Sequence, residues 1–175
     1  MLPREWTPAY VGLGSNLDDP RLQIEHGFAA LASVADSILV CRSRLYRSAP
    51  LGPQNQPDFI NAVAALLTRQ TARSFFAALK DLERRLGRRQ PVERWGPRRI
   101  DFDLLLYGSL TMNDADLVLP HPRLAERNFV LQPLADIAPA LWVPGHGRVS
   151  DLASLAGLRD LEPLEGPPTM TGPDP

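Results

Sequence analysis

An apolar stretch interrupted by two aspartates, two positions apart, restricts the fold of this chain more than any other feature. It is Ile100-Asp101-Phe102-Asp103-Leu104-Leu105-Leu106, and it follows a Gly-Pro-Arg-Arg sequence. Side chains on a β-strand alternate between its faces, so Asp101 and Asp103 share a face and lie roughly 6–7 Å apart along the strand. The apolar residues between them point to the other face. Residues 98–107 are therefore predicted to form a strand with one face in a core and an acidic pair on the other.

Hydrophobic periodicity divides the rest of the chain into alternating strands and helices. We expect strands over residues 10–14, 38–47 and 59–68, and helices over 20–35 and 72–86. The alanine and leucine content of 59–68 also leaves a helix open there. With the strand at 98–107, the order is β-α-β-β-α-β. This split βαβ pattern predicts an α+β fold, a sheet with helices on one face.

A C-terminal helical appendix is expected after the last strand. Gly108-Ser109 can turn the chain so that it returns near residues 117–119. A third helix is predicted over 124–137, kinked or divided at Pro133.

Length and composition indicate one globular domain. A chain of 175 residues fits a single domain, expected over 1–160, followed by a flexible tail rich in proline and glycine over 161–175. No apolar run approaches the ~20 residues of a membrane span, and the N-terminus lacks the apolar segment of a signal peptide. A single cysteine, Cys41, excludes an intrachain disulfide and a cysteine-based zinc site. We therefore expect a cytoplasmic protein.

Positive charge is concentrated in one segment, although the net charge is only −1. Residues 80–99 contain eight lysine and arginine residues against three acidic ones, a local charge of +5. All but one of these cations are arginine, whose planar guanidinium binds phosphate through two parallel hydrogen bonds. This favours a small phosphorylated ligand over a long nucleic acid, which would favour a broader basic face. A solvated helix end and a bias toward arginine explain the charge equally well.

The aspartate pair and the loop before it suggest metal-dependent phosphate chemistry. Mg²⁺ is typically held by one or two carboxylates together with substrate phosphates, which suits Asp101 and Asp103. The loop at 87–98 carries arginines that can stabilise the charge of phosphoryl transfer and close over a nucleotide. Trp95 either covers such a site or anchors the loop. The alternative for the aspartates is an acidic edge strand that blocks aggregation.

Two further segments offer side chains for a ligand. Phe59 and Asn61 lie two positions apart on a predicted strand, so a ring and an amide share a face, which suits a flat heterocycle. Core packing and turn capping are the alternatives. His121 lies near Arg127 in sequence and can contact phosphate with it, or else serve as a capping or surface histidine. The segment Gly12-Leu13-Gly14-Ser15-Asn16 lacks the remaining residues of a dinucleotide loop or a P-loop, which indicates a strand-to-helix turn.

These segments, in this order, closely resemble one family, the 6-hydroxymethyl-7,8-dihydropterin pyrophosphokinases (2-amino-4-hydroxy-6-hydroxymethyldihydropteridine diphosphokinases) of folate biosynthesis. The resemblance extends from Tyr10 to about Leu141. Its carriers are Arg94-Trp95-Gly96-Pro97-Arg98 with Asp101-Phe102-Asp103, Gly14-Ser15-Asn16, Tyr46-Arg47-Ser48, Pro50-Leu51-Gly52, Gln56-Pro57-Asp58-Phe59-Ile60-Asn61, and Pro120-His121 with Arg127 and Phe129. The family implies a ferredoxin-like fold. It also implies transfer of the β,γ-pyrophosphoryl unit of ATP to the hydroxymethyl oxygen of the pterin, with release of AMP.

The resemblance assigns a role to each matching residue. Asp101 and Asp103 would hold two Mg²⁺ ions that bridge the phosphates of ATP, the co-substrate. The implied pterin-binding residues are Ser48, Leu51, Phe59, Asn61 and Phe129, with Asn61 bonding the pterin and the two rings enclosing it. The implied catalytic residues are Arg88 and Arg98, and the implied ATP-binding residues are Glu83, Trp95, His121 and Arg127. Such an enzyme is expected to act as a monomer on small molecules, with neither nucleic acid nor membrane as a partner.

The chain departs from some family members at three positions. Gln90 and Pro91 replace an arginine and a lysine, so loop closure would rely on Arg88 and Arg89, and Phe59 replaces a tyrosine. The residues alone leave two other functions open. One is a ferredoxin-like binding module with arginine-rich contacts to nucleic acid, although the aromatic strand motifs of RNA-recognition domains are missing. The other is a protein that binds metal at the aspartates only for stability.

Overall fold

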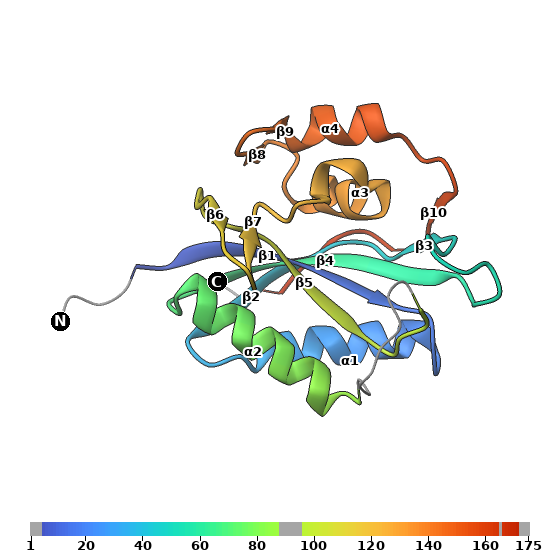
Figure 1. Ribbon diagram of the computed structural model, residues 1–175, viewed down its shortest axis with the longest axis horizontal. Helices are drawn as coiled ribbons and strands as arrows, with labels where there is room; N and C mark the ends of the chain where they lie inside the picture. Colours follow the sequence, from blue (N-terminus) through green and yellow to red (C-terminus); the bar gives the residue numbers. More distant parts are fainter. Residues whose placement is uncertain (1–4, 88–95, 165, 172–175) are drawn as a thin grey trace.

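A computed structural model describes residues 5–87, 96–164 and 166–171 and shows one large antiparallel sheet with helices on both faces (Figure 1). The strands of this sheet are β1 (Thr7–Ser15), β2 (Ser37–Arg42), β3 (Tyr46–Ser48), β4 (Phe59–Thr68), β5 (Asp101–Tyr107), β10 (Leu161–Pro163) and β11 (Thr169–Met170). The described helices are α1 (Pro20–Ala32), α2 (Ala72–Arg85), α3 (Asn128–Ile137) and α4 (Val149–Ala156), with a 3₁₀ turn at Leu124–Glu126. None of them is long and apolar enough to cross a membrane.

The sheet order is β10-β3-β4-β1-β5, and β2 also pairs with β4. The central strand β1 pairs with β4 on one side and β5 on the other, both antiparallel, so Leu13 lies between Ala62 and Phe102. The strand predicted over 59–68 is confirmed as β4, and the helix alternative there is wrong. Because β5 ends this order, its outer edge pairs with no further strand among the described residues.

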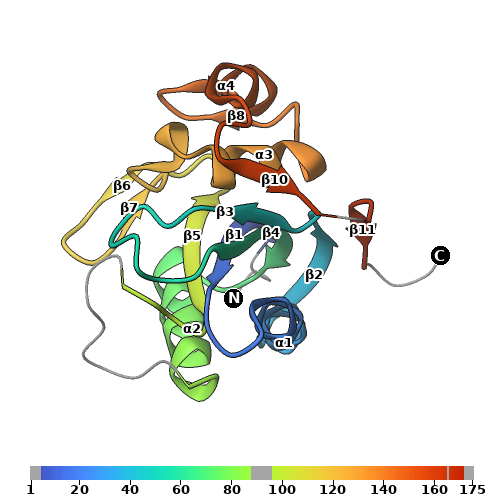
Figure 2. The same ribbon diagram turned by 90° about the vertical axis from the view of Figure 1, so that its right-hand side faces the viewer.

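Helices cover the two faces of the sheet separately (Figures 1 and 2). α1 and α2 pack on one face, where Phe28 and Phe75 join Phe102 in a buried cluster. α3 covers the opposite face, where Leu131 packs with Leu105 in a second cluster, and α4 packs on the outer side of α3. The expectation of helices on one face therefore holds for α1 and α2 only. A second helical layer forms because the sheet carries apolar side chains on both faces, and each face must be shielded from water.

A polar cluster between the β3 region and α3 fixes the position of α3. Asp136 at the end of α3 accepts hydrogen bonds from Arg44 Nη2 at 2.9 Å and from the Tyr46 hydroxyl at 2.9 Å. The Asp136 side chain is only 10% exposed, so the carboxylate of this ion pair is shielded from solvent, whereas the Arg44 side chain is 38% exposed. The cluster joins the helix to the strand that carries Ser48, and both elements border the pocket described below.

Three local features differ from the predicted elements. The strand expected over 38–47 is divided into β2 and β3 at Ser43, whose hydroxyl accepts the N–H of Val63 on β4. The helix expected over 124–137 is interrupted at Arg127, which has an extended backbone, whereas Pro133 lies inside α3. The chain returns to 117–119 as predicted, but there β7 (Val118–Leu119) pairs with β6 (Met112–Asn113) and not with β5.

The C-terminal segment is joined to the sheet edge, which differs from the flexible tail expected from residue 161. β10 pairs with β3, and Arg47 and Glu162 form an ion pair at 3.1 Å. Leu161 and Leu164 are buried, and the Leu164 N–H donates to the carbonyl of Leu45. Composition alone suggested a tail because proline and glycine are common there, but two buried leucines and a free sheet edge supply enough contacts to order it.

Candidate active site

A pocket on the α3 side of the sheet brings together residues that are far apart in the sequence. It is bordered by β1, β3, β4, β5, the loop after β3 and the start of α3. Its lining residues include Ser48, Leu51, Phe59, Asn61, Arg98, Asp101, Asp103, Arg127 and Phe129. These are nine of the thirteen site residues that the sequence resemblance implied. Arg88 and Trp95, two of the others, lie outside the described residues.

Glycines of β1 form the floor of this pocket. Gly12 and Gly14 are two positions apart, so both face the pocket. A Cβ atom at Gly14 would lie 3.5 Å from the Asn61 Oδ1 atom, and one at Gly12 would lie 3.5 Å from the side chain of Leu105. The strand predicted over residues 10–14 is confirmed and contains both glycines, whereas the turn predicted for residues 12–16 begins only after Ser15. The missing side chains of the two glycines leave room above the sheet.

One side of the pocket carries a buried amide and an aromatic ring. Asn61 and Phe59 share a face of β4, as predicted from their spacing, and both line the pocket. The Asn61 side chain is buried, and its Nδ2 donates to Ser48 Oγ at 2.8 Å. This bond fixes the amide plane, because β3 and β4 are paired at the same point. Leu51, 59% exposed, lies in the loop that borders the pocket opening.

The opposite side is built from the start of α3. Arg127 has an extended backbone, and its carbonyl accepts the N–H groups of Val130 and Leu131, which begins the helix. Phe129 then faces the pocket, with the Arg127 guanidinium carbon 5.6 Å from its ring centroid. The pocket therefore has an aromatic ring on β4, another on α3 and a buried amide, with a guanidinium at its rim. A flat heterocycle with hydrogen-bonding edges matches these groups.

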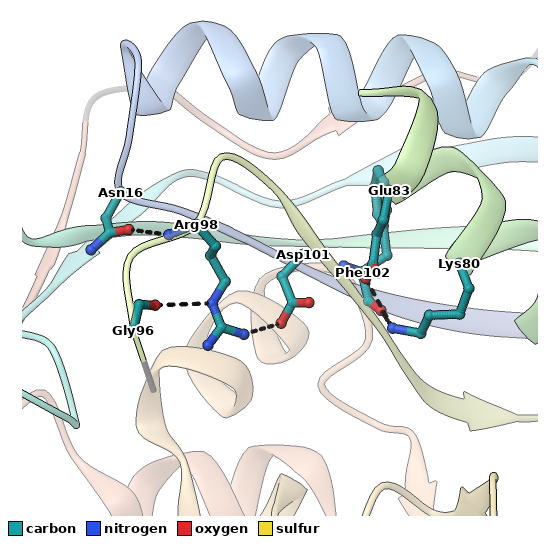
Figure 3. A network of polar contacts seen from close by, with 7 residues as sticks. All are labelled: Asn16, Lys80, Glu83, Gly96, Arg98, Asp101 and Phe102. Atoms are coloured by element: carbon teal, nitrogen blue, oxygen red, sulfur yellow. Dashed lines mark hydrogen bonds and ion pairs between the residues drawn. The ribbon is translucent and has the colours of Figure 1, made fainter. Parts of the chain in front are cut away.

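Asp101 and Asp103 line the same pocket, as their strand alternation predicted. Arg98 Nη1 donates to Asp101 Oδ2 at 2.9 Å (Figure 3). Burial and, to a smaller extent, the charge of Asp101 raise the pKa of Asp103 to about 6. Two carboxylates held close together at this cost fit a hard divalent cation, which would relieve their repulsion and accept oxygen ligands from a phosphate. The described residues include no cluster of three or more metal-binding side chains, so phosphate oxygens and water would complete the coordination.

We expect metal affinity at this pair to fall below pH 6. A carboxyl group must lose its proton before it binds a cation, and Asp103 with a pKa of about 6 is increasingly protonated as the pH falls. Mn²⁺ titrated by electron paramagnetic resonance should bind with constant affinity above pH 7. Its affinity should fall by about tenfold per pH unit well below pH 6. The variant Asp103→Asn should lack this dependence, and equal affinity at pH 5 and pH 8 in the unmodified protein would refute it.

His121 lies in a second cavity that continues from the pocket at Asp103. Its other lining residues include Phe76, Lys80, Leu104, Leu117 and Val118. The Arg123 N–H donates to His121 Nδ1 at 3.2 Å, so the neutral ring carries its proton on Nε2. Burial and the charge of Arg127 lower the pKa of His121 to about 4. At neutral pH this imidazole is therefore uncharged and can donate an Nε2–H hydrogen bond to an anion.

Asn16 supports the pocket without lining it, a role that was not predicted from the sequence. Its buried side chain accepts the Arg98 N–H at 2.9 Å (Figure 3) and donates to the carbonyl of Pro57 at 2.9 Å. It also donates to the Gln56 side chain. Asn16 thus connects the loop before β4 to the segment before β5. Its partners are 40 or more positions away in the sequence, so no local pattern indicates the role.

Glu83 occupies a position different from the expected nucleotide contact. It lines neither cavity, and its side chain on α2 is 2% exposed. Its Oε1 accepts the Phe102 N–H at 2.7 Å and a hydrogen bond from Lys80 Nζ at 2.9 Å. The structure therefore directs this carboxylate to the backbone of β5, between the two aspartates.

Comparison with known proteins agrees with the geometry of the pocket. The family model described as 7,8-dihydro-6-hydroxymethylpterin-pyrophosphokinase (HPPK) matches residues 10–139. The 2-amino-4-hydroxy-6-hydroxymethyldihydropteridine pyrophosphokinase of Pseudomonas aeruginosa is 41% identical over 157 residues, which cover 90% of this chain and 96% of that protein. The protein of the same name from Haemophilus influenzae is 38% identical over 144 residues, covering 82% and 89%.

A crystal structure of Plasmodium falciparum HPPK-DHPS shows that the fold is shared. The TM-score is 0.70 at 14% sequence identity, over 87% of this chain and 46% of that longer chain. The family match spans β1 to the end of α3, the part of the molecule that forms the pocket. The chain belongs to the 7,8-dihydro-6-hydroxymethylpterin-pyrophosphokinase family.

Proposed function

We propose that this protein transfers the pyrophosphoryl group of ATP to the hydroxymethyl group of 6-hydroxymethyl-7,8-dihydropterin, giving the pterin diphosphate and AMP, in folate biosynthesis. The proposal rests on one observation, which is that two kinds of binding site lie in one pocket. An acidic pair, Asp101 and Asp103, lies beside a ring-and-amide site formed by Phe59, Asn61 and Phe129. Relatives at about 40% identity are named pyrophosphokinases for the same pterin.

The ring-and-amide site is the proposed pterin site. Phe59 on β4 and Phe129 on α3 would enclose the flat ring, which is a common mode of binding for heterocycles. Asn61 would bond the polar edge of the pterin, with its amide held by Ser48. Leu51 would close the exposed side from its loop. The hydroxymethyl group would then point toward the acidic pair, which lines the same pocket.

The second cavity is the proposed nucleotide site. Asp103 lines both cavities, so a triphosphate that extends from the second cavity would reach the acidic pair. The apolar wall that includes Phe76, Leu104 and Leu117 suits an adenine ring. His121 and Arg127 would bond the phosphates. Arg88 and Trp95, outside the described residues, are proposed to complete the phosphate and nucleotide contacts.

Two Mg²⁺ ions, proposed to be held by Asp101 and Asp103, would neutralise the β- and γ-phosphates and polarise the reacting phosphorus. The pterin hydroxyl oxygen forms a bond to the β-phosphorus, the bond from that phosphorus to the α,β-bridging oxygen breaks, and AMP departs with this oxygen. The hydroxyl proton is lost to solvent. Arg98, in contact with Asp101, stabilises the charge that develops. With its pKa lowered to about 4 and its Nδ1 bonded to the Arg123 N–H, His121 is a poor general base, so rate enhancement rests on positioning and electrostatics.

The proposal also covers the fold, location and oligomeric state of the whole molecule. We propose a ferredoxin-like core formed by β1, α1, β2 with β3, β4, α2 and β5, because the observed strand order and antiparallel pairing match that unit. The enzyme is proposed to be a cytoplasmic monomer with one catalytic domain, to which β10 and β11 are joined. Its partners are small molecules.

The product of ATP tests this function directly. The protein is mixed with ATP, Mg²⁺ and 6-hydroxymethyl-7,8-dihydropterin, and the nucleotides are separated by chromatography. Equal amounts of AMP and pterin diphosphate are the expected products. ADP would indicate transfer of the γ-phosphoryl group alone, and absence of both nucleotides would favour a binding protein.

Replacing Asn61 by alanine is expected to raise the KM for the pterin by about 10- to 100-fold, since a buried amide that bonds a ligand contributes about 1–3 kcal/mol. The KM for ATP should change by less than about threefold, because Asn61 lines only the pterin side. Steady-state kinetics with each substrate varied in turn measures both constants. Asn128→Ala is a matched control, because this amide bonds the carbonyl of Arg159 on the exterior. An equal rise in both KM values would contradict the assignment.

A further inference from the structure

The strand that carries the acidic pair lies at the edge of the sheet. β5 pairs with β1 on one side, and its outer edge pairs with no other strand in the described part of the chain. Backbone groups along such an edge need other partners, and a strand held on one side only can shift. At Phe102, midway between Asp101 and Asp103, these partners are two side chains of α2.

We infer that Glu83 and Lys80 are positioning residues that fix the Asp101-Phe102-Asp103 backbone, and we call this pair the α2 clamp. Glu83 Oε1 accepts the Phe102 N–H at 2.7 Å, and Lys80 Nζ donates to the Phe102 carbonyl at 2.8 Å. Lys80 also donates to Glu83 Oε1 at 2.9 Å, so the two side chains hold each other (Figure 3). Both backbone polar groups of one residue are thus bonded to one helix.

The position of Phe102 makes the clamp specific to the acidic pair. Its ring is fully buried between the sheet and the helices, so the core restrains the side chain while the clamp restrains the backbone. The Phe102 N–H belongs to the peptide group shared with Asp101, and its C=O belongs to the one shared with Asp103, so a movement of these groups moves both aspartates. A misplacement of about 1 Å at reacting groups is enough to lower a rate by about a hundredfold.

The charge of Glu83 supports a role beyond packing. A carboxylate that is 2% exposed is costly to bury, and here the charges of Asp101 and Asp103 also act against it. An apolar side chain at this position of α2 would avoid that cost but would leave the Phe102 N–H without its carboxylate partner. Lys80 compensates part of the charge. This arrangement is expected if a fixed β5 backbone benefits the enzyme more than the buried charge costs it in folding stability.

Variants at Glu83 separate positioning from direct contact with the nucleotide. This inference rests on the proposed function, so the test includes a readout that is independent of catalysis: hydrogen exchange at the Phe102 amide, followed by NMR. For Glu83→Ala we expect exchange to accelerate by about tenfold or more, since its acceptor is removed. We expect kcat to fall by about 10- to 100-fold. The KM for ATP should stay within about threefold. Glu83→Gln keeps an oxygen that can accept the Phe102 N–H and should recover most of both losses.

Asp81→Asn is the matched control. Asp81 lies on the same helix, is exposed and pairs with Arg84 and Arg85, so its removal should leave exchange and kinetics unchanged. Should Glu83→Ala fail to fold, Lys80→Met keeps an unbranched side chain one atom shorter but removes both hydrogen bonds. It is then expected to lower kcat by several-fold and to accelerate exchange at the Asp103 amide, which follows the released carbonyl.

Two results would overturn the inference. A rise in the KM for ATP with unchanged kcat in Glu83→Ala would show a nucleotide contact, and unchanged Phe102 exchange would show that the clamp does not fix the strand. If the unmodified protein forms no AMP, the proposed function fails. The exchange measurements would still decide separately whether Glu83 and Lys80 hold β5.

Discussion

Asparagine at position 101 or 103 is expected to lower kcat by at least about three orders of magnitude, equivalent to about 4 kcal/mol of transition-state stabilisation. Asparagine keeps the size and most hydrogen bonds of aspartate but removes the charge that would hold Mg²⁺ at the triphosphate. Both side chains line the pocket where the two cavities meet. Production of AMP at saturating ATP, pterin and Mg²⁺ measures the effect. Asp151→Asn, an exposed carboxylate on α4, should retain full activity.

The same substitution at Asp103 is expected to stabilise the metal-free protein. The folded protein raises the pKa of Asp103 to about 6, above its usual value, so folding disfavours the charged form that dominates at pH 7. Removing the charge should raise the melting temperature at pH 7. The gain should vanish below about pH 4, where the carboxyl group is protonated in both the folded and the unfolded state. Loss of folding in both aspartate variants, with activity in whatever folds, would contradict the metal role.

Arg98→Ala is expected to lower kcat by about 10²- to 10³-fold with a smaller change in the KM for ATP. The Arg98 side chain is 18% exposed and lines the pocket, and its guanidinium bonds Asp101 at 2.9 Å. Its contact with the phosphates should strengthen as charge develops during transfer, so the loss appears mainly in kcat. Arg98→Lys keeps the positive charge but lacks the planar guanidinium group, so this variant should recover only part of the rate lost in Arg98→Ala.

The neighbouring arginine provides a control for this experiment. Arg99 is exposed, pairs with Asp18 at 2.7 Å and lines neither cavity, so Arg99→Ala should keep kcat within about twofold. Steady-state and single-turnover measurements separate binding from chemistry. A pure rise in the KM for ATP in Arg98→Ala would mean that the residue contributes equally to the ground state and the transition state.

Features with a local signal could be predicted from the sequence. The alternation of aspartates with apolar residues places Asp101 and Asp103 on one face, because a strand has a period of two whatever surrounds it. The same rule placed Phe59 and Asn61 together. The meeting of these two pairs in one pocket, however, depends on the order of strands. That part of the prediction came from the resemblance to a known family and not from spacing.

Features that depend on distant contacts could not be predicted. Asn16 acts across 82 positions to Arg98, and Glu83 bonds a backbone group on another element, so neither contact has a sequence pattern. The C-terminal strands had the composition of a tail and are ordered by an edge that only the folded sheet provides. Likewise, the interruption at Arg127 rather than at Pro133 depends on where α3 packs against the sheet.

The central claim is that the acidic pair of β5 gathers divalent cations around the triphosphate of ATP. A crystal structure with Mn²⁺, 6-hydroxymethylpterin and an ATP analogue that has a methylene group between its α- and β-phosphates tests this most directly, since Mn²⁺ is located by its anomalous signal. We expect Mn²⁺ bound to both Asp101 and Asp103 at about 2.1 Å, with phosphate oxygens as further ligands. The pterin ring should lie between Phe59 and Phe129. Mn²⁺ bound elsewhere, with both carboxylates lacking any cation beside an ordered triphosphate, would contradict the account.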